Sequence, residues 1–357
     1  MRKREKINIK ALMINTFAGF ALSAFVSVSV FGYIFNDEAS FEAEKEVSWQ
    51  DAYFGFEEET TEEYAQPVFI HALTEEEIAS QPETTGTAEG GGKLNITAED
   101  LSNLKDINFL KKNFYIVDSR TDLVQSDIDA EKFINMDFSL DESTEGPKIL
   151  IFHTHSSEMF ADSDPSKGIS EGIWGAGERL KQILEEKYNI EVLHDDGRYD
   201  VVNGKGQITG AYERMEPSIR KILADNPSIE VAIDMHRDGV NDGVRLVTEQ
   251  NGKKCAKIMF FNGMCRLNKN GALESISSLP NKYITENLAF SFNMQLAANK
   301  MFPDFTRKIY VNAYRYSLHM LPKSLLIEVG AQTNTKEEVY NSMEVLAQIL
   351  AEVLKAE

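Results

Sequence analysis

The chain has 357 residues, 42% of them hydrophobic, so it can bury a sizeable core in one large domain or two modest ones. Its formal net charge is −20, with no basic patch or basic domain, which excludes the electrostatic footprint of a nucleic-acid-binding protein. The charge is unevenly distributed, and this distribution divides the chain into segments.

The N-terminal segments have the pattern of a membrane anchor. Residues 1–10 are basic, residues 11–36 carry no charge, and acidic residues begin at Asp37. A helix needs about 20 mostly apolar residues to cross a bilayer, and flanking positive charge stays on the cytoplasmic side. We therefore predict a cytoplasmic tail at 1–10 and a single-pass transmembrane signal anchor at 11–36, which leaves the C-terminal domain extracytoplasmic at the cell membrane. A cleaved signal peptide is the alternative, but its apolar region should be shorter and end in a small-residue cleavage site.

Two further segments precede the main domain. Residues 37–95 are rich in Glu and Thr and end in TTGTAEGGGK, a composition that predicts a disordered acidic linker. Residues 96–146 predict a small ordered lead-in segment, with a helix starting near Thr97 and a short strand at NFYIVD. The cysteines, Cys255 and Cys265, do not form a disulfide framework, and the sequence leaves open whether they pair.

The remaining residues, 147–357, alternate between two patterns. Short apolar runs typical of buried strands occur at 148–152, 190–194, 231–235 and 324–329. Helical periodicity occurs at 172–188, 212–226, 281–301 and 335–356. This order predicts an α/β fold, a single mixed, mostly parallel sheet with helices on both faces. The turn dipeptide Asn251-Gly252 predicts a hairpin that adds antiparallel strands to the sheet edge.

Three of the predicted strands end in side chains that bind metals or transfer protons. KILIF is followed by HTHSSE (153–158), VAI by DMHRD (234–238), and LLI by Glu328. Ligand sites of open α/β sheets lie at the carboxyl ends of strands, so these residues are expected to meet there.

A catalytic zinc takes three protein ligands, often two histidines and one carboxylate. His155 and Glu158 are spaced to reach one ion from a single loop, and His236 would be the third ligand. Glu328 would then act as general base and acid, taking a proton from water and passing it to a leaving amine. The residues therefore predict a Zn²⁺ hydrolase.

The motifs ILIFHTHSSEMF (149–160), VAIDMHRDG (231–239) and LLIEVGAQTNTKEEV (325–339) resemble those of the stage II sporulation protein P family, in the same order. The resemblance covers most of residues 95–357. It implies a zinc-dependent N-acetylmuramoyl-L-alanine amidase with additional endopeptidase action, and a zinc amidase fold of the phosphorylase/hydrolase-like type. It also implies peptidoglycan as substrate, a role in engulfment of the forespore, and two partners, a sporulation lytic transglycosylase and a membrane protein.

The resemblance also assigns residues. It places His155, rather than His153, at the first ligand position, His236 at the second, and Glu328 as the catalytic glutamate. The carboxylate ligand stays open between Glu158, which has the His-x-x-Glu spacing of zinc carboxypeptidases, and Glu171, which lies where the cell-wall amidases draw theirs.

Three more residues are expected near the metal. His153 is expected to orient a ligand or line the cleft, and Arg237 and Asp238 to support a metal-bound histidine. Arg237 has an alternative role, binding a carboxylate of the substrate. Two other functions are also open: a zinc carboxypeptidase or endopeptidase acting on stem peptides, and a non-catalytic cell-wall-binding scaffold that has no need of metal ligands.

Overall fold

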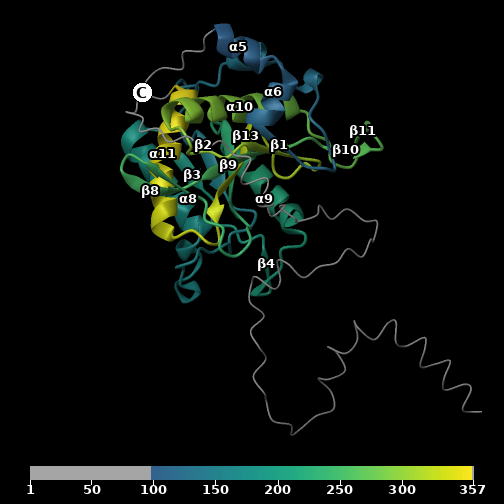
Figure 1. Cartoon of the computed structure of the whole chain (residues 1–357). Helices are drawn as coiled ribbons and strands as arrows, with labels where there is room; N and C mark the ends of the chain where they lie inside the picture. The colour runs from purple at the N-terminus through teal and green to yellow at the C-terminus, as the bar shows by residue number, and fades with distance from the viewer. Residues whose placement is uncertain (1–97, 356–357) are drawn as a thin grey trace, which may run out of the picture. The chain divides into compact units, whose positions relative to one another are not determined.

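The computed structural model describes residues 98–355 (Figure 1). Within this part of the chain, no helix combines the length and the apolar character that a membrane span requires. The predicted anchor at 11–36 and the predicted linker at 37–95 lie outside the described residues, so both stay predictions.

The helices and strands follow the predicted order from the lead-in segment onward. The helices are α5 (Ala98–Leu104), α6 (Ile107–Asn113), α7 (Ala130–Ile134), α8 (Ile173–Tyr188), α9 (Ala211–Asp225), α10 (Ile284–Met301) and α11 (Lys336–Leu354). The strands are β1 (Tyr115–Val117), β2 (Ile149–Phe152), β3 (Val192–His194), β4 (Val201–Val202), β5 (Lys205–Gly206), β6 (Val231–Asp238), β7 (Val247–Gln250), β8 (Lys253–Ala256), β9 (Ile258–Gly263), β10 (Arg266–Lys269), β11 (Ala272–Ser275), β12 (Ile309–Asn312) and β13 (Lys323–Ala331). Three short 3₁₀ helices are η1 (Gln125–Asp127), η2 (Pro165–Lys167) and η3 (Ile169–Glu171).

The main sheet has seven strands in the order β1-β12-β9-β13-β6-β2-β3. All neighbouring pairs are parallel except β13 with β9, which are antiparallel. The prediction of a mixed, mostly parallel sheet is therefore confirmed for the main sheet, but it is not the single sheet that was predicted, because the described residues also form three two-stranded sheets. The four apolar runs expected to be strands become β2, β3, β6 and β13, and the first, third and fourth lie side by side in the middle of the sheet.

Helices cover both faces of this sheet, because successive residues of each buried strand point to opposite faces. On one face α8, α10 and α11 pack over Ile149, Ile151 and Ile327, and α8 and α11 lie against each other (Figure 1). On the other face α9 packs over Leu150, Phe152 and neighbouring residues. The strand runs contain apolar residues at consecutive positions because both of their faces are buried.

The prediction for the hairpin at Asn251-Gly252 was wrong in one respect. The turn forms, and Asn251 adopts the positive φ of 50° that such a turn requires. However, β7 and β8 pair only with each other, in a separate two-stranded sheet. It is the next strand, β9, that joins the main sheet, and it lies inside the sheet between β12 and β13 rather than at its edge.

The lead-in segment adds a strand to the same sheet. β1 pairs in parallel with β12, with Tyr115 opposite Ile309, at one edge of the sheet. The helical part of this segment is divided into α5 and α6, because Asp106 caps α6 by accepting a hydrogen bond from the backbone N–H of Asn108 at 2.9 Å. Cys255 and Cys265 are both buried free thiols.

Candidate metal centre

The candidate site lies where β2 and β6 end side by side. These strands pair in parallel, with Phe152 opposite Asp234, so the turn after β2 reaches the last residues of β6. Within that turn the backbone N–H of Glu158 donates to the carbonyl oxygen of His155 at 3.4 Å, which brings these two side chains together. On the other side of β6, β13 places Glu328 directly opposite His236.

The structure brings His155, Glu158 and His236 into one group. Each offers a ligand atom, and these atoms all lie within 4.8 Å of one another. Glu158 Oε1 lies 3.5 Å from His155 Nδ1 and 3.6 Å from His236 Nδ1, so one carboxylate oxygen faces both rings. All three side chains are buried. Two histidines and one carboxylate are the donor set of many catalytic zinc sites.

Glu158 is held in this position by two neighbouring elements. Its Oε2 accepts a hydrogen bond from the backbone N–H of Arg237 at 2.8 Å, which leaves Oε1 directed at the histidines. Its carbonyl oxygen accepts from the N–H of Ile173 at 2.9 Å, in the first turn of α8. Gly172 permits this approach, because a Cβ there would lie 2.1 Å from that carbonyl oxygen. The start of α8 therefore fixes the backbone of Glu158, and β6 fixes its carboxylate.

His236 is oriented by a carboxylate on its own strand. Its Nε2 lies 2.9 Å from Asp234 Oδ1, which leaves Nδ1 facing Glu158. Asp234 is itself fixed, since Thr154 donates to it from its backbone N–H at 2.9 Å and from its hydroxyl at 2.7 Å. A histidine whose second nitrogen meets a carboxylate is the usual arrangement around protein-bound metals.

The group contains buried polar atoms that the protein leaves without hydrogen bonds. Both nitrogens of His155, Nδ1 of His236 and Oε1 of Glu158 have no hydrogen-bond partner among the described residues. Such orphaned atoms are costly in a folded protein unless a ligand satisfies them. The pKa values of the group agree with this. His236 holds the pKa of Glu158 well below its usual range, and Asp234 and Glu158 hold the pKa of His236 well above its usual range. Burial opposes both shifts. A positive charge is therefore favoured between these residues.

Glu328 lies beside this group without belonging to it. Its side chain is fully buried, and neither of its oxygens has a hydrogen-bond partner within the described part of the chain. Burial and, next, the charge of Asp238 raise the pKa of Glu328 well above its ordinary value. A carboxyl group with a raised pKa next to a candidate metal centre can accept a proton and give it back, as a general base and acid does.

The structure does not bring Glu171, the alternative carboxylate, to the histidines. Its carboxylate pairs with Lys336 at the start of α11 and accepts from the backbone N–H of Asp164 at 3.2 Å. Glu171 lies in η3, one turn before α8, where its side chain binds elements that cover the sheet rather than the strand ends.

His153 lies on the opposite face of the sheet from His236. Its Nδ1 lies 2.8 Å from the carbonyl oxygen of Met235, and its Nε2 lies 2.9 Å from Nε2 of His194. A Cβ on Gly177 of α8 would lie 2.7 Å from His153, so the ring is enclosed between the sheet and this helix. His153 was expected to orient a ligand or line the cleft; the structure places it between the sheet and α8, where it contacts the backbone of the strand that carries His236.

The burial of His153 predicts a pH dependence of stability. Burial and, next, His194 lower the pKa of His153 from 6.5 to about 3. The folded state therefore binds this proton less readily than the unfolded state, so its contribution to stability is complete above about pH 6.5 and is lost as the pH falls towards 3. As the pH falls below 6, we expect the free energy of unfolding to decrease more steeply in the wild type than in His153→Asn. The two slopes should differ by up to about 1.4 kcal/mol per pH unit. Denaturant unfolding between pH 7.5 and pH 5 checks this, and parallel curves would contradict it.

The side chains of Arg237 and Asp238 contact groups other than the two histidines of the candidate metal centre. The guanidinium of Arg237 donates to the carbonyl oxygens of Met159 at 3.0 Å and Asp238 at 3.3 Å, while its backbone N–H supports Glu158. Asp238 Oδ2 accepts from Arg307 Nη1 at 2.7 Å, and both side chains are fully buried. The support that was expected from Asp238 comes instead from Asp234.

The sequence reasoning missed the roles of Asp234 and Arg307. Asp234 had a usable signal, because it lies two residues before His236 in the same strand and therefore on the same face. Arg307 had none, since it lies in a short segment before β12, 69 residues from Asp238 in the sequence.

The fold and this site define an α/β protein with a buried candidate metal centre of two histidines and one glutamate. A family model described as stage II sporulation protein P matches residues 44–351, so the chain belongs to that family. Stage II sporulation protein P of Bacillus subtilis (strain 168) is 21% identical over 227 residues, which cover 59% of this chain and 53% of that protein. The chain thus spans about half the length of the curated relative that it matches. The family resemblance of the motifs is confirmed.

Solved structures of amidases give weaker matches. N-acetylmuramyl-L-alanine amidase Ami1 from Mycobacterium smegmatis is 13% identical, with 62% of this chain and 99% of that chain covered, at a TM-score of 0.33. The CwlD amidase from Clostridioides difficile, solved in complex with the GerS lipoprotein, is 12% identical, with 58% and 94% covered, at a TM-score of 0.34. TM-scores this low do not establish a shared fold, so the zinc amidase topology stays a prediction.

Proposed function

We propose that this chain is a zinc-dependent peptidoglycan hydrolase of sporulation, an N-acetylmuramoyl-L-alanine amidase that cuts the amide bond between the glycan's lactyl group and the stem peptide. The observation that carries the proposal is the convergence of His155, Glu158 and His236 beside Glu328 in a chain of the stage II sporulation protein P family. Action at the cell membrane follows from the predicted anchor at 11–36. Partnership with a lytic transglycosylase and a membrane protein is part of the same proposal.

The residues present fit a zinc ion. His155, Glu158 and His236 would hold it, because their unpartnered nitrogen and oxygen atoms already face a common centre. Three protein ligands leave a fourth position for water or substrate, as in catalytic zinc sites. The chemistry that zinc supplies in such sites is Lewis acidity, which polarises a carbonyl group and makes water easier to deprotonate.

The remaining steps belong to the residues of the chain. Glu328 takes a proton from the attacking water at its carboxylate and passes it to the nitrogen of the leaving amine, and its burial keeps competing bulk water away. Asp234 keeps His236 in one orientation, and the backbone N–H of Arg237 does the same for Glu158. Glu328 is fixed in turn by its position in the centre of the sheet.

The choice of carboxylate ligand can be tested on the metal itself. We expect Glu158→Gln to weaken zinc binding by at least about 100-fold, more than is usual for changes to residues around the ligands. Glu171→Gln is the matched control and should leave the affinity unchanged, since Glu171 pairs with Lys336. Competition with a chelating dye measures both values. An equal loss of zinc affinity in the two variants would contradict the assignment of Glu158, and a loss only in Glu171→Gln would reverse it.

Cleavage products distinguish the amidase from its alternatives. The full-length protein in detergent is incubated with purified peptidoglycan, with and without a chelator, and the new termini are identified. An amidase releases stem peptides that begin with a free L-alanine, whereas a carboxypeptidase or endopeptidase creates termini within the stem peptide or its crosslinks. Binding without any cleavage would indicate a scaffold. Cleavage that is unaffected by the chelator would rule out the zinc mechanism.

A further inference from the structure

The candidate metal centre and Glu328 are closed off from solvent in this conformation. The side chains of His155, Glu158, His236 and Glu328 belong to residues that are each at most 5% exposed. In the proposed mechanism, however, water and the amide of a substrate must reach them. A centre that is closed in this way works only if one of its walls moves.

Three of the walls are held by hydrogen bonds. Asp200 ties down the turn after β2, because it accepts from the hydroxyl of Ser156 and from the backbone N–H of Ser157, each at 2.9 Å. The backbone N–H of Arg237 holds the carboxylate of Glu158 at 2.8 Å. The strands β6 and β13 are paired with each other inside the main sheet. Moving any of these walls would leave buried polar groups without partners, which is costly.

The wall formed by Tyr212 has no such bond. This residue lies in the first turn of α9, which covers the face of the sheet to which His236 and Glu328 point. Its ring packs edge to face against the ring of His155, with centroids 5.8 Å apart and an interplanar angle of 76°. Its hydroxyl is buried and has no hydrogen-bond partner among the described residues. Packing alone therefore keeps the ring against His155.

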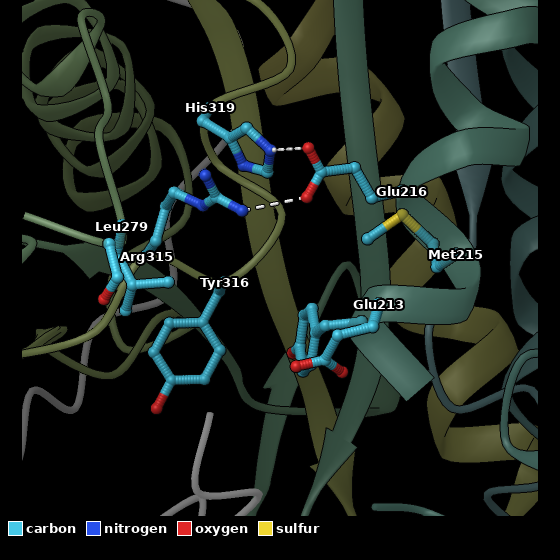
Figure 2. A pocket seen from close by; sticks show the side chains of 9 residues that line it. Glu213, Met215, Glu216, Leu279, Arg315, Tyr316 and His319 are labelled. Atoms are coloured by element: carbon cyan, nitrogen blue, oxygen red, sulfur yellow. Dashed lines mark hydrogen bonds and ion pairs between the residues drawn. The ribbon is translucent and has the colours of Figure 1, made fainter. Parts of the chain in front are cut away.

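Tyr212 also borders a pocket. The pocket has a volume of about 160 Å³ and lies between α9 and the segment that precedes β13 (Figure 2). Tyr212 lines it, whereas none of the three metal ligands is among the described residues that do. Tyr212 is thus in contact with the pocket and with His155, and the pocket provides space into which its ring can move.

The opening that these contacts permit is a rotation of the Tyr212 side chain. The helix itself is tied to the preceding loop by Arg214, which donates to the carbonyl oxygens of Tyr199 at 2.6 Å and Thr209 at 3.0 Å. Rotation of the ring leaves these bonds intact and breaks no hydrogen bond of the tyrosine hydroxyl within the described part of the chain. Its cost is the packing of one aromatic ring.

We propose that Tyr212 is the gate of the metal centre: its ring rotates away from His155 into the pocket, and only then can an ion or a substrate amide enter. The inference rests on the proposed function for the presence of a metal. Because the ring contacts His155 and not the ion, it closes over the empty and the loaded centre alike. The gate therefore controls how fast the centre exchanges its contents, and not how tightly it holds them.

Zinc exchange by the full-length protein in detergent tests the gate. A chelating dye and rapid mixing give two rates, the release of Zn²⁺ from the loaded protein and its uptake by the metal-free protein. We expect both rates to rise at least about tenfold in Tyr212→Ala, because a minor open state is populated to about a tenth or less. The dissociation constant should stay within about threefold of the wild type, since the gate acts equally on both directions.

Three further variants complete the experiment. Tyr212→Phe keeps the ring and loses only the hydroxyl, so both of its rates should match the wild type. Tyr212→Leu keeps an apolar side chain in the core and should show the same joint rise even if Tyr212→Ala does not fold. Tyr188→Ala, at the end of α8 that is remote from Glu158, is the matched control and should exchange zinc at the wild-type rates.

Unchanged rates in Tyr212→Ala and Tyr212→Leu overturn the inference. Faster release with weaker binding overturns it too, because the ring would then support the ligands instead of closing the centre. So does an equal acceleration in Tyr212→Phe, since closure would then depend on the hydroxyl. A wild type that binds no Zn²⁺ contradicts the proposed function and the gate together, whereas one that binds Zn²⁺ but exchanges it as fast as Tyr212→Ala contradicts the gate alone.

Discussion

Replacing Glu328 with glutamine is expected to lower the rate of peptidoglycan cleavage by at least about 10³-fold, because in the proposed mechanism this one residue supplies both the general base and the general acid. Glutamine has nearly the same shape, so the fully buried site stays filled. It cannot exchange a proton, however, and the leaving amine then receives none. Release of soluble wall fragments by equal amounts of wild type and variant measures the effect.

The same variant separates catalysis from metal binding. Glu328 is outside the His155–Glu158–His236 group, so zinc affinity should stay within about threefold of the wild type while activity is lost. Glu338→Gln is a suitable control, since Glu338 is a buried glutamate that caps α11 and pairs with Arg245 instead of facing the two histidines. It should cleave at the wild-type rate. Undiminished activity of Glu328→Gln would refute the proposed role of this residue.

The second large effect concerns stability. Asp238→Ala is expected to lower the free energy of unfolding by about 3–5 kcal/mol, because it leaves the guanidinium of Arg307 buried without its counter-charge. The two side chains are 1% and 0% exposed, and Arg307 Nε and Nη2 already have no hydrogen-bond partner among the described residues. Equilibrium unfolding in urea at neutral pH measures this difference.

A partly exposed ion pair is the matched comparison. Lys336→Ala breaks the pair with Glu171, whose side chains are 25% and 17% exposed, and it should cost less than about 1 kcal/mol. If Asp238→Ala cost no more than Lys336→Ala, the buried pair would not be important for stability. Replacing both members of the buried pair, in Asp238→Ala combined with Arg307→Met, should recover much of the loss, because no unpaired charge remains.

The sequence by itself determined the strands that carry the site. The runs that became β2, β6 and β13 are apolar at consecutive positions, a pattern typical of strands buried on both faces. Because parallel strands end at the same edge, the sequence also predicted that His155, His236 and Glu328 would lie near one another. It identified a possible ligand set for the same reason, since His155 and Glu158 lie in one turn.

Only the tertiary structure decided which of the neighbouring polar residues face that set. Glu158 rather than Glu171 meets the histidines because Arg237 and the start of α8 hold it there, while Lys336 binds Glu171. These contacts join segments that are distant in the sequence, so no local pattern could reveal them. The same holds for the position of β9 inside the sheet, for β1 at its edge, and for the pairing of Asp238 with Arg307. Local periodicity determines which residues a strand buries, whereas the packing of remote segments determines which buried polar atoms meet.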